Sequence, residues 1–233
     1  MKGPPAILAA FVLLSAVLLS AAAVSGCSGL FHSNARPEQV YYLRAPSAGA
    51  AEGSGAGGAS NPAALVPPAS LRVTHPLAAP GLDTQRIMLV QNDHRMNFFA
   101  GSRWPSAVPD VVESLVAQTL RASGAWASVE DTASPFPSDY LLQTAVRRFE
   151  ADYTGGAAAP VVYVVIDCVI GRGEGRDVIA TFSASGSAPA SANRLSEVVN
   201  AFEQASGAAL SSLASQAVRA VRDNEERRNR AVR

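Results

Sequence analysis

The chain has 233 residues, and its 19 basic and 19 acidic side chains give a formal net charge of zero. A neutral chain has no strong positive field, which argues against a nucleic-acid partner. Hydrophobic residues make up 48% of the chain, enough for one sizeable core, while two cysteines are too few for a disulfide framework.

Residues 1–26 have the layout of an export signal. Lys2 supplies the positive start, residues 6–23 are uncharged and mostly apolar, and small residues precede Cys27. A retained transmembrane helix is the alternative, because about 20 apolar residues can span a bilayer. The shortness of the apolar run and the small residues after it favour a cleaved signal peptide.

The tetrad Val24-Ser25-Gly26-Cys27 resembles the lipobox of bacterial lipoproteins, although Leu is the commoner first residue there. The resemblance implies cleavage after Gly26 and attachment of S-diacylglycerol and an N-acyl chain such as palmitate to Cys27. Two or more acyl chains make a stable membrane anchor. In such lipoproteins an Asp after the cysteine favours the inner membrane. Here Ser28 follows, which implies an outer-membrane lipoprotein that faces the periplasm.

Residues 27–39 are predicted to be a lipidated tether. A first strand is predicted at 40–46, where aromatic and β-branched residues end at a proline. Residues 45–70 are almost entirely Ala, Gly, Ser and Pro, a composition that cannot bury enough apolar surface to order itself. This insert is predicted to be disordered, either as a spacer or as a loop between two strands of one domain.

The middle of the chain is predicted to form a strand at 71–76 and a hairpin of 86–92 with 94–100 around Asn92-Asp93. Residues 108–124 have a helical apolar stripe of Val112, Leu115, Val116 and Leu120. Gly124 suits the end of this helix. A short strand is predicted at 126–130.

The last part is predicted to form strands at 139–152, 161–170 and 177–187, then a helix at 192–222 and a polar tail at 223–233. Cys168 lies on a wholly apolar face of its strand, where a thiol behaves as a small hydrophobe. Together the elements predict one α/β domain over 40–222. It has a mixed sheet of about six strands packed by two main helices, including a long C-terminal helix.

The sequence predicts no catalytic or metal site and no cofactor. None of His32, His75 and His94 has a Cys, His or carboxylate at helical metal spacing, and no G-x-S-x-G elbow is present. The stretch 171–176, GRGEGR, leads into a strand and is expected to be a hairpin loop. Asp167 could be a buried acid, but it is expected to face Arg147 or another partner at the sheet margin, or water. The chain is therefore predicted not to be an enzyme.

Phe99, Arg103 and Trp104 are the candidate partner-contact residues. Phe98 and Phe99 are consecutive in a strand, so one is expected to face the core and the other not. Arg103 and Trp104 follow within a turn, and aromatic residues and arginine dominate interface hot spots. The alternative is that Arg103 and Trp104 only cover the end of the following helix.

Residues 71–112 resemble the ABC-type transport auxiliary lipoproteins, a PqiC-like family. The matching motifs are an early YYL at 41–43, GLDxxRI at 81–87, FFA at 98–100, RW at 103–104 and a helix that starts near Pro109. The resemblance covers most of residues 40–215 and brings no catalytic residues.

The resemblance implies an auxiliary component, or adaptor, that works with the MCE-domain protein of an ABC transporter. Such systems move lipids or hydrophobic molecules between the inner and outer membranes. The adaptor is implied to dock the periplasmic assembly against the outer membrane, with a homo-oligomeric ring of copies as one arrangement. Two alternatives remain at this point: an envelope assembly lipoprotein that serves lipopolysaccharide or peptidoglycan machinery, and a lipid carrier.

Overall fold

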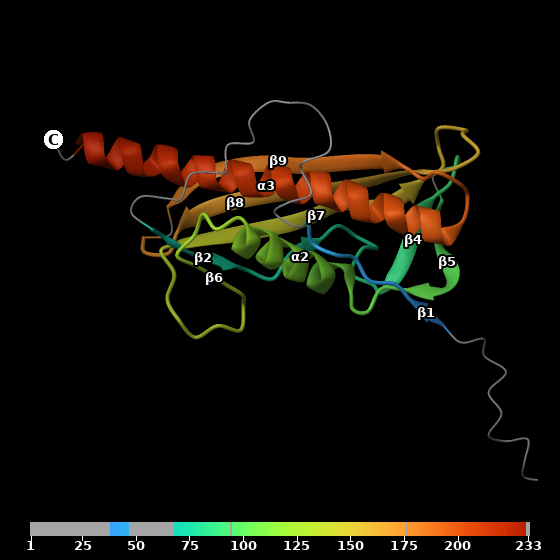
Figure 1. The fold of residues 1–233 in the computed structure, drawn as a ribbon, viewed down its shortest axis with the longest axis horizontal. Helices are drawn as coiled ribbons and strands as arrows, with labels where there is room; N and C mark the ends of the chain where they lie inside the picture. The colour runs from blue at the N-terminus through green and yellow to red at the C-terminus, as the bar shows by residue number, and fades with distance from the viewer. Residues whose placement is uncertain (1–37, 47–67, 94, 176, 232–233) are drawn as a thin grey trace, which may run out of the picture. The chain divides into compact units, whose positions relative to one another are not determined.

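The computed structural model describes residues 38–46, 68–93, 95–175 and 177–231, which belong to one unit that begins at Glu38 (Figure 1). The predicted signal peptide, its cleavage site, Cys27 and the tether up to residue 37 lie outside the described residues. Residues 47–67 of the predicted insert lie outside them as well.

Nine strands and two helices follow one another along the described chain. The strand β7 is the centre of the sheet: it pairs with β8 in antiparallel fashion along its length, and β8 pairs with β9 in the same way. The elements are β1 (Gln39–Val40), β2 (Ser70–Val73), β3 (Leu77–Ala78), β4 (Arg86–Val90), β5 (Met96–Arg103), α2 (Val108–Ala122), β6 (Ser128–Glu130), β7 (Tyr140–Asp152), β8 (Val161–Arg172), β9 (Val178–Pro189) and α3 (Leu195–Ala231).

The other edge of β7 is shared by three strands in turn. β2, β3 and β4 each pair with it in parallel, near its start, middle and end. β6 then pairs with β2, while β5 pairs with β4 and β1 with β5. The mixed α/β architecture is confirmed, and the sheet has more strands than predicted. The strand β3 has no counterpart among the predicted strands, because its two residues are too few for a period-two pattern to reveal.

Both helices cover the same face of the sheet, with α3 along β8 and β9 and α2 nearer β2 (Figure 1). The predicted stripe of α2 is buried, and Gly124 takes a positive φ of 64° just after the helix, as a C-terminal stop requires. The alternate residues of β8 that face the helices are buried, and they include Cys168 on its predicted apolar face: Val162, Val164, Ile166, Cys168 and Ile170.

Helix α3 approaches β9 very closely because the facing residues are small. A Cβ built at Gly186 would lie 2.1 Å from the backbone oxygen of Ala205 and 2.9 Å from the Cβ of Ala208. Glycine is therefore required here for space. The alternating Ala and Gly residues of β9 let the helix backbone rest almost directly on the strand.

Three predicted boundaries were wrong. Of the predicted strand 40–46, only Val40 lies in the observed strand β1 (Gln39–Val40); beyond it the chain packs Tyr41 and Leu43 against the core. The helix predicted to end at 222 continues through 231, because its polar last turns make contacts: Glu225 bonds to Tyr140 and pairs with Arg228. The predicted insert ends too late, since β2 begins at Ser70, inside it.

Two chemical predictions are confirmed. Cys168 is fully buried, its Sγ lies 3.7 Å from the Ile166 carbonyl oxygen, and burial raises the pKa of its thiol to about 12. Arg147 and Asp167 form an exposed ion pair of 2.9 Å on the sheet face away from the helices. Among the described residues, no helix is both long and apolar enough to cross a membrane.

Candidate functional site

The β4–β5 hairpin contains a wide bulge, and this bulge shapes the candidate site. Phe98 lies opposite Met88 and Arg103 lies opposite Arg86, so residues 99–102 of β5 face only one residue of β4. Gly101 has a φ of 64°, a left-handed conformation that glycine adopts without cost. The bulge bends β5 away from β4 and towards β1, which pairs with Ser102 and Arg103.

Arg103 is held between two side chains after the bulge. Its Nε lies 3.0 Å from Oε2 of Glu38, and its Nη1 donates to Oε1 of Gln85 at 2.9 Å. One third of the Arg103 side chain remains exposed, whereas Glu38 is 62% exposed. The guanidinium is therefore fixed in direction and still accessible, which lowers the entropy that a contact with a partner would cost.

The two consecutive phenylalanines are both partly buried and pack against the core. The expectation that one of them points away from the core was therefore wrong: the bulge interrupts the strict alternation of the strand. The Arg86 guanidinium lies 4.0 Å from the centroid of the Phe98 ring, a cation–π contact. Phe99 keeps part of its ring accessible at the bulge.

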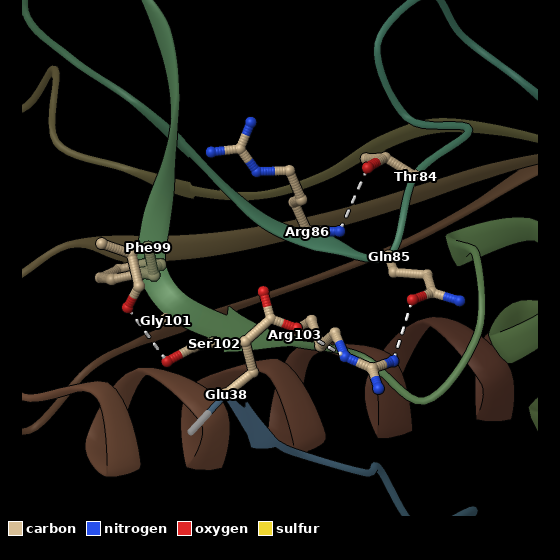
Figure 2. A pocket seen from close by; sticks show the side chains of 9 residues that line it. Glu38, Thr84, Gln85, Arg86, Phe99, Gly101, Ser102 and Arg103 are labelled. Carbon is tan, nitrogen blue, oxygen red and sulfur yellow. Dashed lines mark hydrogen bonds and ion pairs between the residues drawn. The ribbon is translucent and has the colours of Figure 1, made fainter. Parts of the chain in front are cut away.

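An open hollow of about 780 Å³ lies between the bulge, the start of β1 and the segment before β4. Figure 2 shows Arg103 extending towards Gln85, with Phe99 on the opposite side of the hollow and Glu38 between them. The hollow combines a fixed arginine, a carboxylate, polar backbone and part of an aromatic ring. Its lining residues are Glu38, Thr84, Gln85, Arg86, Phe99, Ala100, Gly101, Ser102 and Arg103.

Trp104 is not part of this surface. Its side chain is fully buried, so the hypothesis that it contacts a partner directly is wrong. The ring packs edge-on against Phe149 of β7 and Phe202 of α3, with centroid distances of 5.8 and 5.2 Å. The alternative, a structural role, is the one observed, although Trp104 packs on α3 and β7 and not only at the end of α2.

Of the residues that line the hollow, sequence reasoning named Phe99 and Arg103 as candidates but not Glu38 and Gln85. Glu38 precedes the predicted strand, and its approach to Arg103 depends on a parallel pairing across more than 60 residues. Gln85 lies between two motif residues, and its backbone oxygen accepts a hydrogen bond from the Trp104 N–H at 2.7 Å. Both roles come from tertiary pairing, which a local pattern does not encode.

A second polar cluster lies around α2. The Nδ1 of His75 lies 2.9 Å from Glu113, whose other carboxylate oxygen accepts a hydrogen bond from Thr132 at 2.9 Å. In the ranges that the structure describes, no group of three His, Cys, Asp or Glu residues is placed to hold a metal ion. These hydrogen bonds connect the segment after β2, helix α2 and the loop after β6.

The sequence matches a known family model. The model of the family described as "ABC-type transport auxiliary lipoprotein component" matches residues 54–214. A search of curated proteins finds no significant match. The matched range contains the bulge, Trp104 with its ring contacts, and the first half of α3. The motifs at 81–87, 98–100 and 103–104 lie within it and contribute residues to the hollow, whereas the YYL motif at 41–43 lies outside it.

Solved structures include one that shares the fold and several more distant ones. Protein XCC0632 from Xanthomonas campestris, described with the family model DUF330, superposes with a TM-score of 0.67 at 23% identity, covering 82% of this chain and 99% of that one. A PelC dodecamer from Paraburkholderia phytofirmans has a TM-score of 0.39 at 19% identity and covers 64% and 90%. Lipoprotein GNA1162 from Neisseria meningitidis has a TM-score of 0.35 at 16% identity and covers 57% and 96%. The Xanthomonas protein shares the fold; the other two are too distant to inform this chain.

Proposed function

The chain belongs to the family of ABC-type transport auxiliary lipoprotein components, and from this premise we propose that it is a non-enzymatic adaptor of an MCE-type ABC transport system. In this proposal Cys27 carries the lipid anchor in the outer membrane and the domain from Glu38 onward faces the periplasm. There it contacts the MCE-domain protein, and the system moves lipids or other hydrophobic molecules between the two membranes.

The family match over residues 54–214 carries the proposal. A family of lipoproteins belongs to the cell envelope, and an auxiliary component of a transporter acts through a partner. The sequence adds the lipobox-like tetrad that ends at Cys27 and Ser28, a residue compatible with sorting to the outer membrane. A ring of copies remains part of the proposal as one arrangement of the adaptor.

The hollow beside Arg103 supports a docking role for this domain. A guanidinium held at 3.0 Å by Glu38 and at 2.9 Å by Gln85 is preorganised, and Phe99 adds accessible aromatic surface beside it. Such an arginine and aromatic pair suits a protein partner with a carboxylate next to an apolar side chain. We propose that this surface contacts the transporter.

Site-specific crosslinking in cells tests the proposal. A photoreactive amino acid is placed at Phe99 in the full-length chain, and the matched control carries it at Glu174, an exposed residue of the β8–β9 turn. Adducts are purified from the outer-membrane fraction and identified by mass spectrometry. The proposal expects an MCE-domain protein at Phe99 and not at Glu174.

Three other results would count against the proposal. Adducts with lipopolysaccharide or peptidoglycan machinery would identify an envelope assembly lipoprotein, and lipid bound stoichiometrically by the purified chain would identify a carrier. Recovery of the chain only from the inner membrane would contradict the predicted sorting.

A further inference from the structure

A second hollow, of about 540 Å³, lies at the end of the sheet where α3 begins (Figure 1). This volume is within the range of about 300–1,000 Å³ that is typical of small-molecule sites. The hollow shares no residue with the hollow beside Arg103. Its polar lining comes from the β4–β5 turn, the β7–β8 turn and the loop between β9 and α3: Gln91, Asn92, Asp93, Arg95, Tyr153 and Asn193. We call it the amide hollow.

The backbone of the amide hollow is already used by the fold. The end of β4 pairs with β5 on one side and with β7 on the other. Beyond the strand, the Gln91 N–H donates to the Arg95 carbonyl at 3.0 Å, and the Tyr153 N–H donates to the Val90 carbonyl at 2.9 Å. An extended peptide binds by adding a strand to a free edge, and the end of β4 offers none. The groups that remain for a ligand are therefore side chains.

Three side-chain amides supply these groups. In the part of the chain that the structure describes, the amides of Gln91 and Asn92 have no hydrogen-bond partner, and Asn193 uses only its Oδ1. Each amide has a carbonyl oxygen that accepts and an NH₂ group that donates. A hydroxyl group also both donates and accepts, so separate amides around a hollow suit a ligand that carries many hydroxyl groups.

Tyr153 supplies an aromatic surface with a fixed orientation. Its hydroxyl donates to Oδ1 of Asn193 at 2.7 Å, and its half-buried ring packs against the core. The same residue lines a smaller hollow of about 100 Å³ along the β7–β8 turn, which also contains Tyr163. An aromatic ring with a polar rim gives an apolar surface for the C–H face of a sugar ring. The polar surface continues past Tyr153, as a chain of sugar rings requires.

The charges around the amide hollow favour a neutral ligand. Asp93 and Arg95 form an ion pair with each other, and they are the only charged residues among the described residues that line the hollow. The lining therefore has no unbalanced charge with which to hold a phosphate or a carboxylate.

We propose that the amide hollow binds a neutral saccharide of a cell-envelope glycan. The three amides bond to hydroxyl and acetamido groups of the sugar, and the Tyr153 ring packs against one face of it. Two envelope glycans offer this chemistry: the sugar strands of peptidoglycan and the polysaccharide of lipopolysaccharide. The inference goes beyond the proposed transport role and does not depend on it, because a ligand here leaves the hollow beside Arg103 free.

Titration calorimetry of the full-length chain in detergent tests the site. The chain is titrated in separate runs with a soluble N-acetylglucosamine oligomer, with the neutral, lipid-free polysaccharide of lipopolysaccharide, and with the stem peptide of peptidoglycan. We expect a saccharide to bind and the peptide not to bind. Binding of the N-acetylglucosamine oligomer would identify peptidoglycan strands as the source, and binding of the polysaccharide alone would identify lipopolysaccharide.

Two substitutions place the saccharide in the amide hollow. Gln91→Ala is expected to raise the Kd about threefold to tenfold, because it removes the hydrogen bonds of one neutral amide. Tyr153→Phe keeps the ring but releases Asn193, and it is expected to raise the Kd about twofold. The matched control is Gln143→Ala, an exposed glutamine of β7 outside both hollows, which should leave the Kd unchanged. Gln91→Ala and Gln143→Ala should melt at the temperature of the parent chain.

The proposal is overturned if the parent chain binds neither saccharide. It is also overturned if Gln91→Ala melts like the parent and binds the saccharide equally tightly, since the ligand would then lie elsewhere. Binding of the stem peptide without binding of a saccharide would make the hollow a peptide site, which contradicts the proposal as well.

Discussion

The β4–β5 corner and the β9–α3 layer are built from opposite kinds of residue. At the corner, a bulge displaces four residues from the ladder, and large side chains hold the result: Arg103 bonds to Glu38, and Trp104 fills the core below. In the β9–α3 layer the smallest side chains are used, and Gly186 lets α3 rest on the strand. The corner requires large side chains that fill the core, and the layer requires small side chains that let α3 lie close to β9.

This difference separates an interaction surface from a packing layer. The corner presents a fixed cation and an accessible aromatic ring, which can recognise a particular partner. The β9–α3 layer has no charged residue in β9, and its small side chains determine how closely α3 approaches the strand. Substitutions should therefore have different effects in the two regions: truncation damages the corner, and addition of atoms damages the layer.

The largest effect is expected from Trp104→Ala. Removal of this fully buried ring leaves a cavity beside Phe149 and Phe202, and it should cost about 3–5 kcal/mol of unfolding free energy. Trp104→Phe should cost less, because the Trp104 Nε1 has no hydrogen-bond partner in the described part of the chain. Urea denaturation of both variants checks the order, which equal losses would contradict.

In the layer, Gly186→Ala should be destabilising although it adds a single methyl group. The new Cβ would meet the Ala205 backbone oxygen at 2.1 Å, so α3 must shift, at a cost of about 1–3 kcal/mol. Gly207→Ala in the same helix is the control. A Cβ there meets no atom within 4 Å, and the variant should gain about 0.5–1 kcal/mol. Thermal unfolding that shifts both variants in the same direction would contradict this description.

Arg103→Ala should separate recognition from stability at the corner. Its ion pair with Glu38 is exposed, so the loss should be at most about 1 kcal/mol in denaturant titrations. Crosslinking to the partner through Phe99 should nevertheless fall sharply, because the guanidinium is the fixed cation of the hollow. Unchanged crosslinking in a stably folded variant would show that Arg103 serves only to hold β1.

The smallest effect is expected at the start of β2, where Asp139 accepts hydrogen bonds from the Ser70 N–H and hydroxyl, both at 2.7 Å. The backbone hydrogen bond from Ser70, followed by that from its hydroxyl, lowers the pKa of Asp139 below its ordinary value. A lowered folded-state pKa means that this stabilisation is complete above about pH 4 and is lost as the pH falls through the folded pKa. Asp139→Asn should therefore be less stable than the parent near neutral pH, with the difference shrinking in acid. A constant difference across this range would contradict the assignment.

Much of the fold could be predicted from the sequence because its main elements have strong periods. The alternation in β7, the strongly apolar run of β8 and the stripe of α2 identify three elements that contribute much of the core. The end of α3 was missed because its polar last turns have no apolar stripe, and contacts such as Glu225 with Tyr140 were not visible in the sequence. The short strand β3 was missed because it has two residues and forms only by pairing with the long strand β7.

The candidate site was half predictable. Residue type pointed to Phe99 and Arg103, but residue type also pointed to Trp104, which the structure buries. Residue type alone does not distinguish a buried tryptophan from an exposed one. The contacts of Trp104 with Phe149 and Phe202 show that it belongs to the core. Glu38 carried no signal, because its role depends on a strand pairing formed across the chain.

One measurement tests the central claim most directly: photoreactive residues placed at Phe99 and at Glu174, in separate full-length chains, crosslinked in the same cells. We expect Phe99 to give an adduct with a transporter component and Glu174 to give none. The same adducts at both positions, or no transporter component at Phe99, would contradict the account.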